Sequence, residues 1–489
     1  MQPLTHLFTS GKGVVMTKYA THYSPKQTPQ RQPIPGREAE MVQNHEGAFV
    51  FPIDGWKRLD RFLILGCDTP TYYQSEKALT IENAQAVKAC IAQDGRKVLD
   101  RIVEISQSGR APKNDPAIFA LAMCFAFGDP DTKSRAKSAL PKVCRIGTHL
   151  AKFVESVTTL RNWSAGLRKG VSEWYTGMDP NRLAYQMVKY QSREGWSHRD
   201  ILRLAHPSTR SVKHDAIFRW VICHGNLDAR QVKRQRGKEA IRHDTYQAID
   251  RTLLPDMIQA FEQAQQPDVT DQALVKLIKD YTLPMEAIPT EKRSKAVYAA
   301  VYPGAGLTWI IRNLGNLSKH GILAKGNFDD NKAICDLITN PEGLKRAKVH
   351  PIQILSAWLT YQQGHGTRGK GTWEVVSDIG DALDRAFYTA FGNVQPAGVN
   401  TVLALDVSPS MGGGVIAGVP GLTPRMGAAA MAMVTYKTEP RCEVLAFHDR
   451  LVPIDISRSK RLNDVVDGIE RASRGWGDRK STRDRRAHV

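Results

Sequence analysis

Cations, histidines and aromatic side chains crowd the stretch KYQSREGWSHRDILRLAH, residues 189–206. Its cations are accompanied by only two acids, Glu194 and Asp200. Such residue types can perform general acid–base catalysis or can bind phosphate groups. Nuclease chemistry needs a second catalytic group or a carboxylate-held metal, and no tight acidic cluster accompanies His198 and His206. The composition therefore favours binding of an anion over catalysis.

The spacing in this stretch predicts how the cations are presented. Lys189 and Arg193 are four residues apart, as are Arg199 and Arg203, so each pair shares a face wherever its segment is helical. The residues EGWS are expected to interrupt the helix and form a turn. The two pairs of cations should then lie on either side of this turn. Tyr190 and Trp196 are more often core anchors than base-stacking platforms, and the two histidines are more often hydrogen-bonded structural residues than acids or bases.

Basic charge is concentrated in other parts of the chain as well. The net charge is +19, and residues 132–170 hold nine Lys or Arg and a single acid, Glu155. An excess of this kind indicates a polyanionic partner, either nucleic acid or an anionic membrane surface. A further cluster, ARQVKRQRGKEAIRH, covers residues 229–243. The further candidate RNA-binding residues outside the opening stretch are Arg110, Lys113, Arg145, His149, Arg161, Arg168 and Lys169.

The sequence also limits the class of protein. No run of about 18 apolar residues could span a bilayer, and the N-terminus lacks the apolar core of a signal peptide, which predicts a cytoplasmic protein without a membrane partner. The seven cysteines are scattered and form no CxxC pair, so neither a disulfide framework nor a zinc site is expected.

Three regions are expected along the chain. Residues 1–45 are polar and proline-rich, which predicts an extended arm. Residues 46–395 show helical periodicity almost throughout, and the apolar segment NDPAIFALAMCFAFGDP predicts a buried helix with Asp115 as its cap and Gly128 at its end. Successive helices of this kind predict an α-solenoid of stacked pairs. Residues 396–489 alternate strand and helix, with strands at VNTVLALD and CEVLAF, and end in a basic tail.

Long ordered strings in this chain resemble the Ro autoantigen family, whose helical part is the TROVE domain. They include TPTYYQSEKALTIENA, SGRAPKNDPAIFALA, KYQSREGWSHRDILRLAH, GHGTRGK and LALDVSPSM. The resemblance implies a mostly α fold, a monomeric ring of HEAT-like helical repeats followed by an α/β von Willebrand factor A domain. It also implies binding of Y RNA-like noncoding RNA on the outer face and of single-stranded 3′ ends of misfolded RNA in the hole.

The resemblance extends to individual residues and to partners. Family positions on the RNA-binding outer face match Lys189, Arg193 and His206, and a further family cation falls at Gln191. His198 and Arg199, in the same stretch, complete the set of candidate RNA contacts. The family's role is noncoding-RNA stability and quality control without catalysis, with a 3′–5′ exoribonuclease as a candidate partner. Family chains begin near the segment that starts at Met16, which makes Met16 an alternative start.

The second domain resembles von Willebrand factor A domains, whose metal site begins with DxSxS. Asp406, Ser408 and Ser410 are the matching residues, and their oxygens suit Mg²⁺. The family's later ligand loops have no counterpart in GWGDRKSTRDRRAHV, so the domain is expected to be truncated and to bind Mg²⁺ weakly. Two alternatives remain open: a phosphotransfer hydrolase with Asp406 as nucleophile, although Ser408 stands where its second acid belongs, and a metal-dependent adhesion module.

Overall fold

The computed structural model describes most of the chain, in the ranges 32–44, 47–67, 79–108, 111, 113–209, 211–224, 249–366, 371–416, 419, 421–448, 451–452, 454 and 456–474. These residues form two compact units. One contains residues 37–44 and 50–304, and the other contains the described residues from 305 onward together with 32–36 and 47–49. Of the arm expected over residues 1–45, residues 1–31 and 45 lie outside the described ranges.

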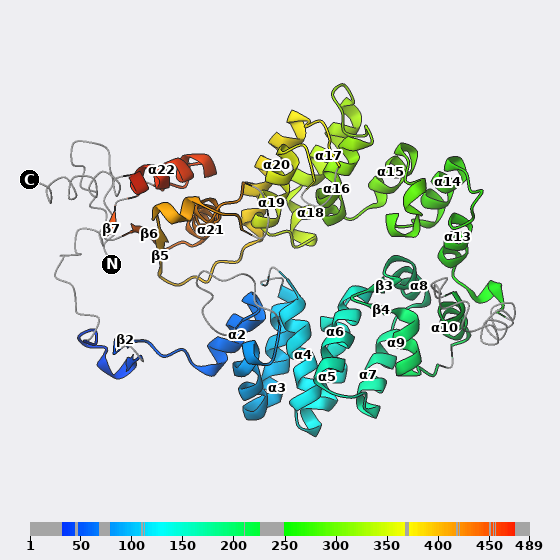
Figure 1. Ribbon diagram of the computed structural model, residues 1–489, viewed down its shortest axis with the longest axis horizontal. Coiled ribbons are helices and arrows are strands. Elements are labelled where there is room, and N and C mark those ends of the chain that lie inside the picture. The colour runs from blue at the N-terminus through cyan, green and yellow to red at the C-terminus, as the bar shows by residue number, and fades with distance from the viewer. Residues whose placement is uncertain are drawn as a thin grey trace, which may run out of the picture. The chain divides into compact units, whose positions relative to one another are not determined.

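Helices build the unit that contains residues 50–304 (Figure 1). The helices are α2 (Gly55–Leu65), α3 (Gln85–Ser108), α4 (Asp115–Phe127), α5 (Pro130–Val143), α6 (Gly147–Leu160), α7 (Ala165–Thr176), α8 (Pro180–Lys189), α9 (His198–Ala205), α10 (Val212–His224), α13 (Asp256–Ala264), α14 (Asp271–Tyr281) and α15 (Lys295–Val301). Short 3₁₀ helices are η1 (Glu38–Glu40), η2 (Glu82–Ala84), η3 (Arg251–Leu253), η4 (Met285–Ala287), η5 (Thr290–Lys292) and η6 (Tyr302–Gly304). The strands are β1 (Val42–Gln43), β2 (Phe49–Val50), β3 (Ser192–Arg193) and β4 (Trp196–Ser197).

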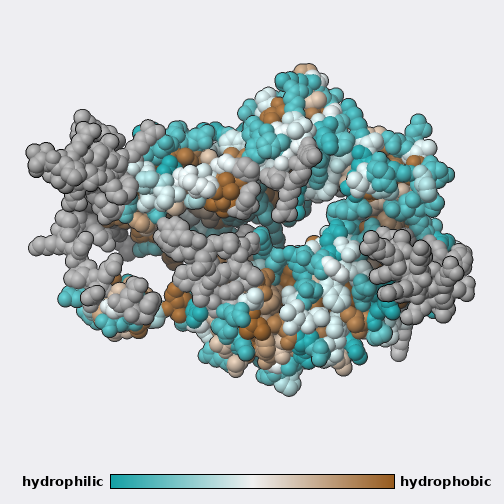
Figure 2. Space-filling view, in the orientation of Figure 1, coloured by the Kyte–Doolittle hydropathy of each residue, from teal (hydrophilic) through white to brown (hydrophobic). Residues whose placement is uncertain are grey.

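Helices two apart in the chain pack side by side in this unit. The helices α3, α5, α7 and α9 contact one another in succession, and α4 contacts α6. Sequential neighbours from α2 to α5 also pack together. This arrangement of stacked helix pairs confirms the helical repeats expected from the sequence, because each pair buries its apolar face against the next. In Figure 2, hydrophilic residues predominate on the visible face of α13 to α15.

The helix α4 shows why the repeats have a continuous core. Residues 116–125 are all buried, so this helix is apolar on every side, as its sequence predicted. The boundary differs by one residue from the prediction: Asn114 is the N-cap and makes no capping hydrogen bond with its side chain, while Asp115 is the first helical residue. Asn114 instead donates to the carbonyl oxygen of Val143 at 3.0 Å. A tertiary contact has replaced the local cap.

The second unit begins with further helices and continues into a small sheet. Its helices are α16 (Leu307–Lys319), α17 (Phe328–Thr339), α18 (Pro341–Arg346), α19 (Pro351–Gln362), α20 (Ser377–Thr389), α21 (Pro424–Thr438) and α22 (Leu462–Arg474), with η7 (Ala390–Asn393) and η8 (Pro409–Gly412) as 3₁₀ helices. The strands are β5 (Thr401–Asp406), β6 (Cys442–Phe447) and β7 (Leu451–Val452).

The order of the strands confirms an α/β arrangement after residue 400. β5 pairs in parallel with β6, from Thr401 opposite Cys442 to Asp406 opposite Phe447, and β7 pairs antiparallel with β6. α21 connects the two parallel strands and packs on both of them and on α22. The buried carboxylate of Glu439 accepts from the amide of Ala397 at 2.6 Å, which fixes the connection from the helices to the sheet.

Among the described residues, no helix combines the length and the apolar character that crossing a bilayer requires. Four of the seven cysteines, Cys67, Cys90, Cys124 and Cys144, are buried.

Candidate functional site

The stretch from Lys189 to His206 forms a corner between two helices. α8 ends at Lys189, and a hairpin of β3 and β4 pairs Arg193 with Trp196 before α9 begins. The turn residues Glu194 and Gly195 both have positive φ, 52° and 77°, as two-residue hairpin turns require. Ser197 caps α9 in a reciprocal box with Asp200. The turn at EGWS is confirmed, but Lys189 and Arg193 do not share a helix face, because Arg193 lies on a strand.

The hairpin nevertheless brings Lys189 and Arg193 together around one aromatic ring. Arg193 Nη2 donates to the carbonyl oxygen of Lys189 at 3.3 Å. The ammonium of Lys189 lies 5.7 Å from the centre of the Tyr190 ring, and the guanidinium carbon of Arg193 lies 5.8 Å from it. Both contacts are within cation–π range. We call Lys189, Tyr190 and Arg193 the cationic corner.

Lys189 remains charged although it is half-buried. Burial by itself lowers the pKa of the Lys189 amine, but a hydrogen bond to the hydroxyl of Tyr185, together with the nearby Tyr190 and Glu286, raises that pKa above its ordinary value. The Nζ donates to Tyr185 Oη at 2.8 Å. A fixed, fully protonated amine is suited to pair with a phosphate. Tyr185 lies outside residues 189–206 and was not among the candidates predicted from the sequence. Its position four residues before Lys189 on one helix is nevertheless a sequence signal for a side-chain contact between the two.

The helix α6 holds the hairpin in place. The Trp196 indole donates to Glu155 Oε2 at 2.6 Å, so the single acid of the basic segment 132–170 serves as an anchor. Lys152 forms ion pairs with Asp115 at 2.5 Å and with Glu194 of the turn at 3.8 Å. Lys152 was not among the candidates predicted from the sequence, and it bridges α4, α6 and the hairpin. The contact between Trp196 and Glu155 ties β4 of the hairpin to α6.

Two of the predicted RNA contacts in this stretch, His198 and Arg199, are buried residues. His198 is 4% exposed, shares a 2.9 Å hydrogen bond with Tyr175, and stacks on Trp174 with ring centres 6.4 Å apart. Burial lowers the pKa of His198 to about 4, so the ring is neutral near pH 7. Arg199 is only 9% exposed. Both residues pack the inner side of the corner and do not face solvent.

His206 is exposed but separate from the cationic corner. It ends α9 in the left-handed conformation, with φ 46°, and its amide donates to the carbonyl oxygen of Leu202. No hydrogen bond or ring contact in the described structure joins it to Lys189 or Arg193. The structure thus brings two of the three residues matched to the family's outer face into contact.

Arg145 and His149 belong to a second polar group beside α6. Arg145 Nη1 donates to Ser106 Oγ at 2.9 Å, and Asn114 lies 3.4 Å from His149 Nδ1. Burial, followed by the charge of Arg145, lowers the pKa of His149 to about 4. His149, a candidate RNA contact, is therefore neutral near pH 7 and does not offer phosphate a positive charge. Its role is to complete a hydrogen-bond network.

The other candidate RNA-binding residues differ in how far their side chains are free to contact a ligand. Arg161 ends α6 and donates from Nη1 to the carbonyl oxygen of Phe125 at 2.5 Å, so part of its guanidinium is committed to the fold. Arg168, Lys169 and Lys113 are exposed, and Lys169 forms an ion pair with Glu173 at 4.0 Å. Arg110 and the basic segment 229–243 lie outside the described residues.

The DxSxS residues occupy the loop after β5 in the second unit. Asp406 Oδ1 accepts from the amide of Ser408 at 2.8 Å, and Ser410 is exposed on η8. The guanidinium of Arg425 packs beside this loop, since a Cβ built on Gly412 would lie 3.1 Å from Arg425 Nη2. Within the described ranges there is no group of three or more His, Cys, Asp or Glu suited to hold a metal. The oxygens of Asp406, Ser408 and Ser410 are of the type that Mg²⁺ takes.

Comparisons with known proteins identify two family domains along the chain. Residues 42–359 match the model of the TROVE domain, and residues 400–480 match that of the Ro60 vWA domain. The chain is 37% identical to the RNA-binding protein RO60 of Deinococcus radiodurans over 457 residues, which cover 93% of this chain and 81% of that protein. It is 31% identical to the RNA-binding protein RO60 of Caenorhabditis elegans over 495 residues, covering 89% and 76% of the two chains.

A solved structure is also similar to this chain. The crystal structure of the Deinococcus radiodurans RO (RSR) protein matches with a TM-score of 0.70 at 37% sequence identity, over 85% of this chain and 80% of that one.

Proposed function

Since this chain belongs to the TROVE-domain family of Ro proteins, we propose that it binds structured RNA through its cationic corner. The observation that carries the proposal is the pairing of Lys189 and Arg193 around Tyr190, on a hairpin anchored to α6. Two fixed cations on a rigid support match adjacent phosphates of an RNA backbone, and little side-chain entropy is lost on binding.

The test compares binding of a hairpin RNA to the wild type and to a variant in which Lys189, Arg193 and His206 are changed to alanine. Affinity should fall while the helical circular-dichroism signal stays the same, because these side chains lie at the surface or half-buried at the corner. A matched control changes Lys276 and Lys279 on the exposed side of α14. Equal affinity of the wild type and the triple variant would show that the corner does not bind RNA.

The finer identity of the ligands is also a proposal, supported by the family membership. The RNA on the outer face is a small structured noncoding RNA of the Y RNA type, and single-stranded 3′ ends of misfolded RNA enter the hole of a monomeric ring. A hairpin RNA with a single-stranded tail should then bind more tightly than either part alone, because the second contact becomes intramolecular. Equal affinity for tailed and untailed RNA would contradict the second site.

We assign the protein a binding role without catalysis of its own, in noncoding-RNA stability and quality control beside a 3′–5′ exoribonuclease. Ser408 stands where a phosphotransfer hydrolase of the type considered needs a second acid, so nothing supports Asp406 as a nucleophile. We propose that Asp406, Ser408 and Ser410 hold Mg²⁺ weakly, because one carboxylate and two hydroxyls give little charge compensation.

A further inference from the structure

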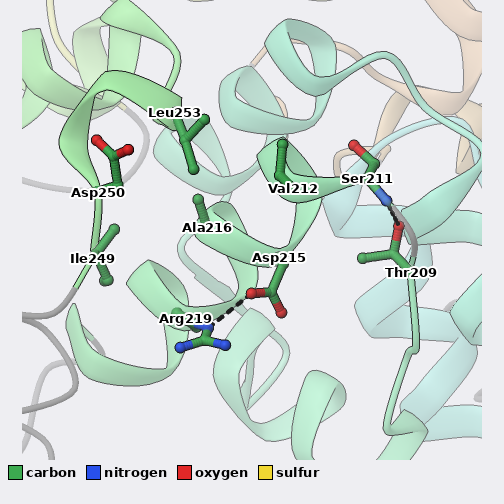
Figure 3. Close-up of a pocket in the computed structure, with 9 residues that line it drawn as sticks. All are labelled: Thr209, Ser211, Val212, Asp215, Ala216, Arg219, Ile249, Asp250 and Leu253. Carbon is green, nitrogen blue, oxygen red and sulfur yellow. Dashed lines mark hydrogen bonds and ion pairs between the residues drawn. The ribbon is translucent and has the colours of Figure 1, made fainter.

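A cavity of 330 Å³ lies beside α10, in the same unit as the cationic corner. Figure 3 shows its arrangement: residues of α10 run along the middle, with Ile249 and Leu253 on one side and Thr209 and Ser211 on the other. Its volume lies within the range of pockets that hold small ligands, which begins at about 300 Å³. α10 also packs against α8, the helix that ends at Lys189.

The walls of the cavity combine apolar side chains with three charged ones. Val212, Ala216, Ile249 and Leu253 supply the apolar part. Thr209 and Ser211 are occupied by local hydrogen bonds, since the amide of Ser211 donates to Thr209 Oγ1 at 3.1 Å and Ser211 Oγ is 2.9 Å from His214 Nδ1. The charged groups are Asp215, Arg219 and Asp250, and Asp250 Oδ1 accepts from the amide and the hydroxyl of Thr252 at 3.0 and 2.7 Å.

Asp215 and Arg219 have hydrogen-bonding capacity left over. Arg219 Nε donates to Asp215 Oδ2 at 2.8 Å, as Figure 3 shows. Asp215 Oδ1 and both terminal nitrogens of Arg219 have no partner among the described residues. The pair therefore presents, side by side, a carboxylate that accepts and a guanidinium that donates. Ion pairs one helical turn apart are common on helix surfaces, but this one borders an apolar cavity.

We propose that this cavity receives an unpaired guanine base of a bound RNA. The Watson–Crick edge of guanine carries two adjacent donors, N1–H and the 2-amino group, beside the acceptor O6. The carboxylate of Asp215 matches the two donors and the guanidinium of Arg219 matches O6, as carboxylates and arginine do at other base edges. The apolar walls accept the faces of the purine ring. A uracil edge, with one donor between two acceptors, places an acceptor against the carboxylate.

The inference rests on the proposed RNA-binding function and assigns to it a base preference that phosphate contacts cannot supply. Phosphates are the same for every sequence, so the cationic corner alone binds all sequences alike. A cavity one helix away from that corner adds the discrimination.

The test measures binding of short oligouridylates that contain one central guanosine, inosine or adenosine. Inosine keeps N1–H and O6 but lacks the 2-amino group. We expect the change from guanosine to inosine to weaken binding to the wild type about tenfold, the usual size of one good base contact. Asp215→Asn should remove most of this difference, while Asp271→Asn, at the start of α14, should preserve it.

The outcomes separate this inference from the proposed function. Equal affinity of the wild type for the guanosine and inosine strands, with hairpin RNA still bound at the corner, would contradict the guanine pocket alone. Failure to bind any of these RNAs would contradict both proposals. A preference for guanosine that survives Asp215→Asn would also overturn the assignment, because the base would then be recognised elsewhere. The affinities of the wild-type protein for the guanosine and inosine strands can be compared even if the Asp215→Asn variant does not fold.

Discussion

Arg193 donates a hydrogen bond from Nη2 to the backbone carbonyl oxygen of Lys189, 3.3 Å away, from the first strand of the hairpin back to the end of α8. This contact holds the guanidinium of Arg193 close to the backbone of Lys189. The same arginine also donates to the carbonyl oxygen of Ser192 at 2.6 Å. A guanidinium held by two carbonyl groups on one side keeps its remaining N–H groups for an anion on the other.

Gly147 is predicted to be essential for the geometry of the corner. A Cβ at this position would lie 2.8 Å from Tyr190 Cβ and 2.8 Å from His198 Nε2, closer than packed atoms tolerate. Gly147→Ala should cost about 1–3 kcal/mol of stability through overpacking and should weaken RNA binding by displacing Tyr190. Gly166→Ala on α7 is the matched control, because nothing lies within 4 Å of its Cβ position. Thermal melts and RNA titrations of both variants check this prediction, which identical behaviour would contradict.

His198 is predicted to make the fold sensitive to acid. Burial holds its pKa at about 4 in the folded protein, against 6.5 as the ordinary value. Between pH 6.5 and about 4 the unfolded chain binds a proton at His198 while the folded protein does not. Proton binding therefore favours the unfolded chain, so the free energy of unfolding is highest above pH 6.5 and falls as the pH decreases toward 4. The loss approaches about 3 kcal/mol over that window. Urea denaturation at several pH values should show it.

The variant His198→Gln tests the assignment of this acid sensitivity. Glutamine does not titrate, so the decline of the unfolding free energy between neutral and acid pH should be shallower than in the wild type. His149 has its pKa lowered to about 4 as well, and therefore part of the decline should remain. An undiminished decline in the variant would show that other groups cause it.

Sequence periodicity predicted the helical repeats and the β/α alternation because both depend on apolar patterns along the chain. The buried helix at residues 115–127 and the strand at 401–406 are examples. The burial of His198 was not predictable in the same way. The side chain of His198 is buried against Trp174 and Tyr175 and fits there because Gly147 has no side chain. These three residues belong to other helices.

The candidate site was predictable in composition and only partly in geometry. The residues EGWS indicated a turn, yet the short strands on either side have too few residues to show alternation. The roles of Lys152 and Glu155 as anchors were hidden because their partners lie at Glu194 and Trp196, in a distant part of the sequence. Local patterns cannot report such tertiary contacts.

RNA binding is predicted to be independent of divalent ions. The cations of the corner need no metal to contact phosphate, and Asp406, Ser408 and Ser410 supply only one carboxylate for a divalent ion. RNA affinity and melting temperature should therefore be the same with millimolar Mg²⁺ and with excess chelator. A rise in melting temperature with Mg²⁺ that Asp406→Ala abolishes would contradict weak metal binding.

The salt dependence of RNA binding tests the cationic corner most directly. Each phosphate contact contributes about one unit to the slope of log affinity against log salt, so Lys189→Ala with Arg193→Ala should reduce that slope by up to about two units. The control double variant Lys276→Ala with Lys279→Ala, on α14, should leave the slope close to that of the wild type. A slope unchanged by loss of Lys189 and Arg193, at unchanged affinity, would contradict the assignment of the corner as the RNA-binding site.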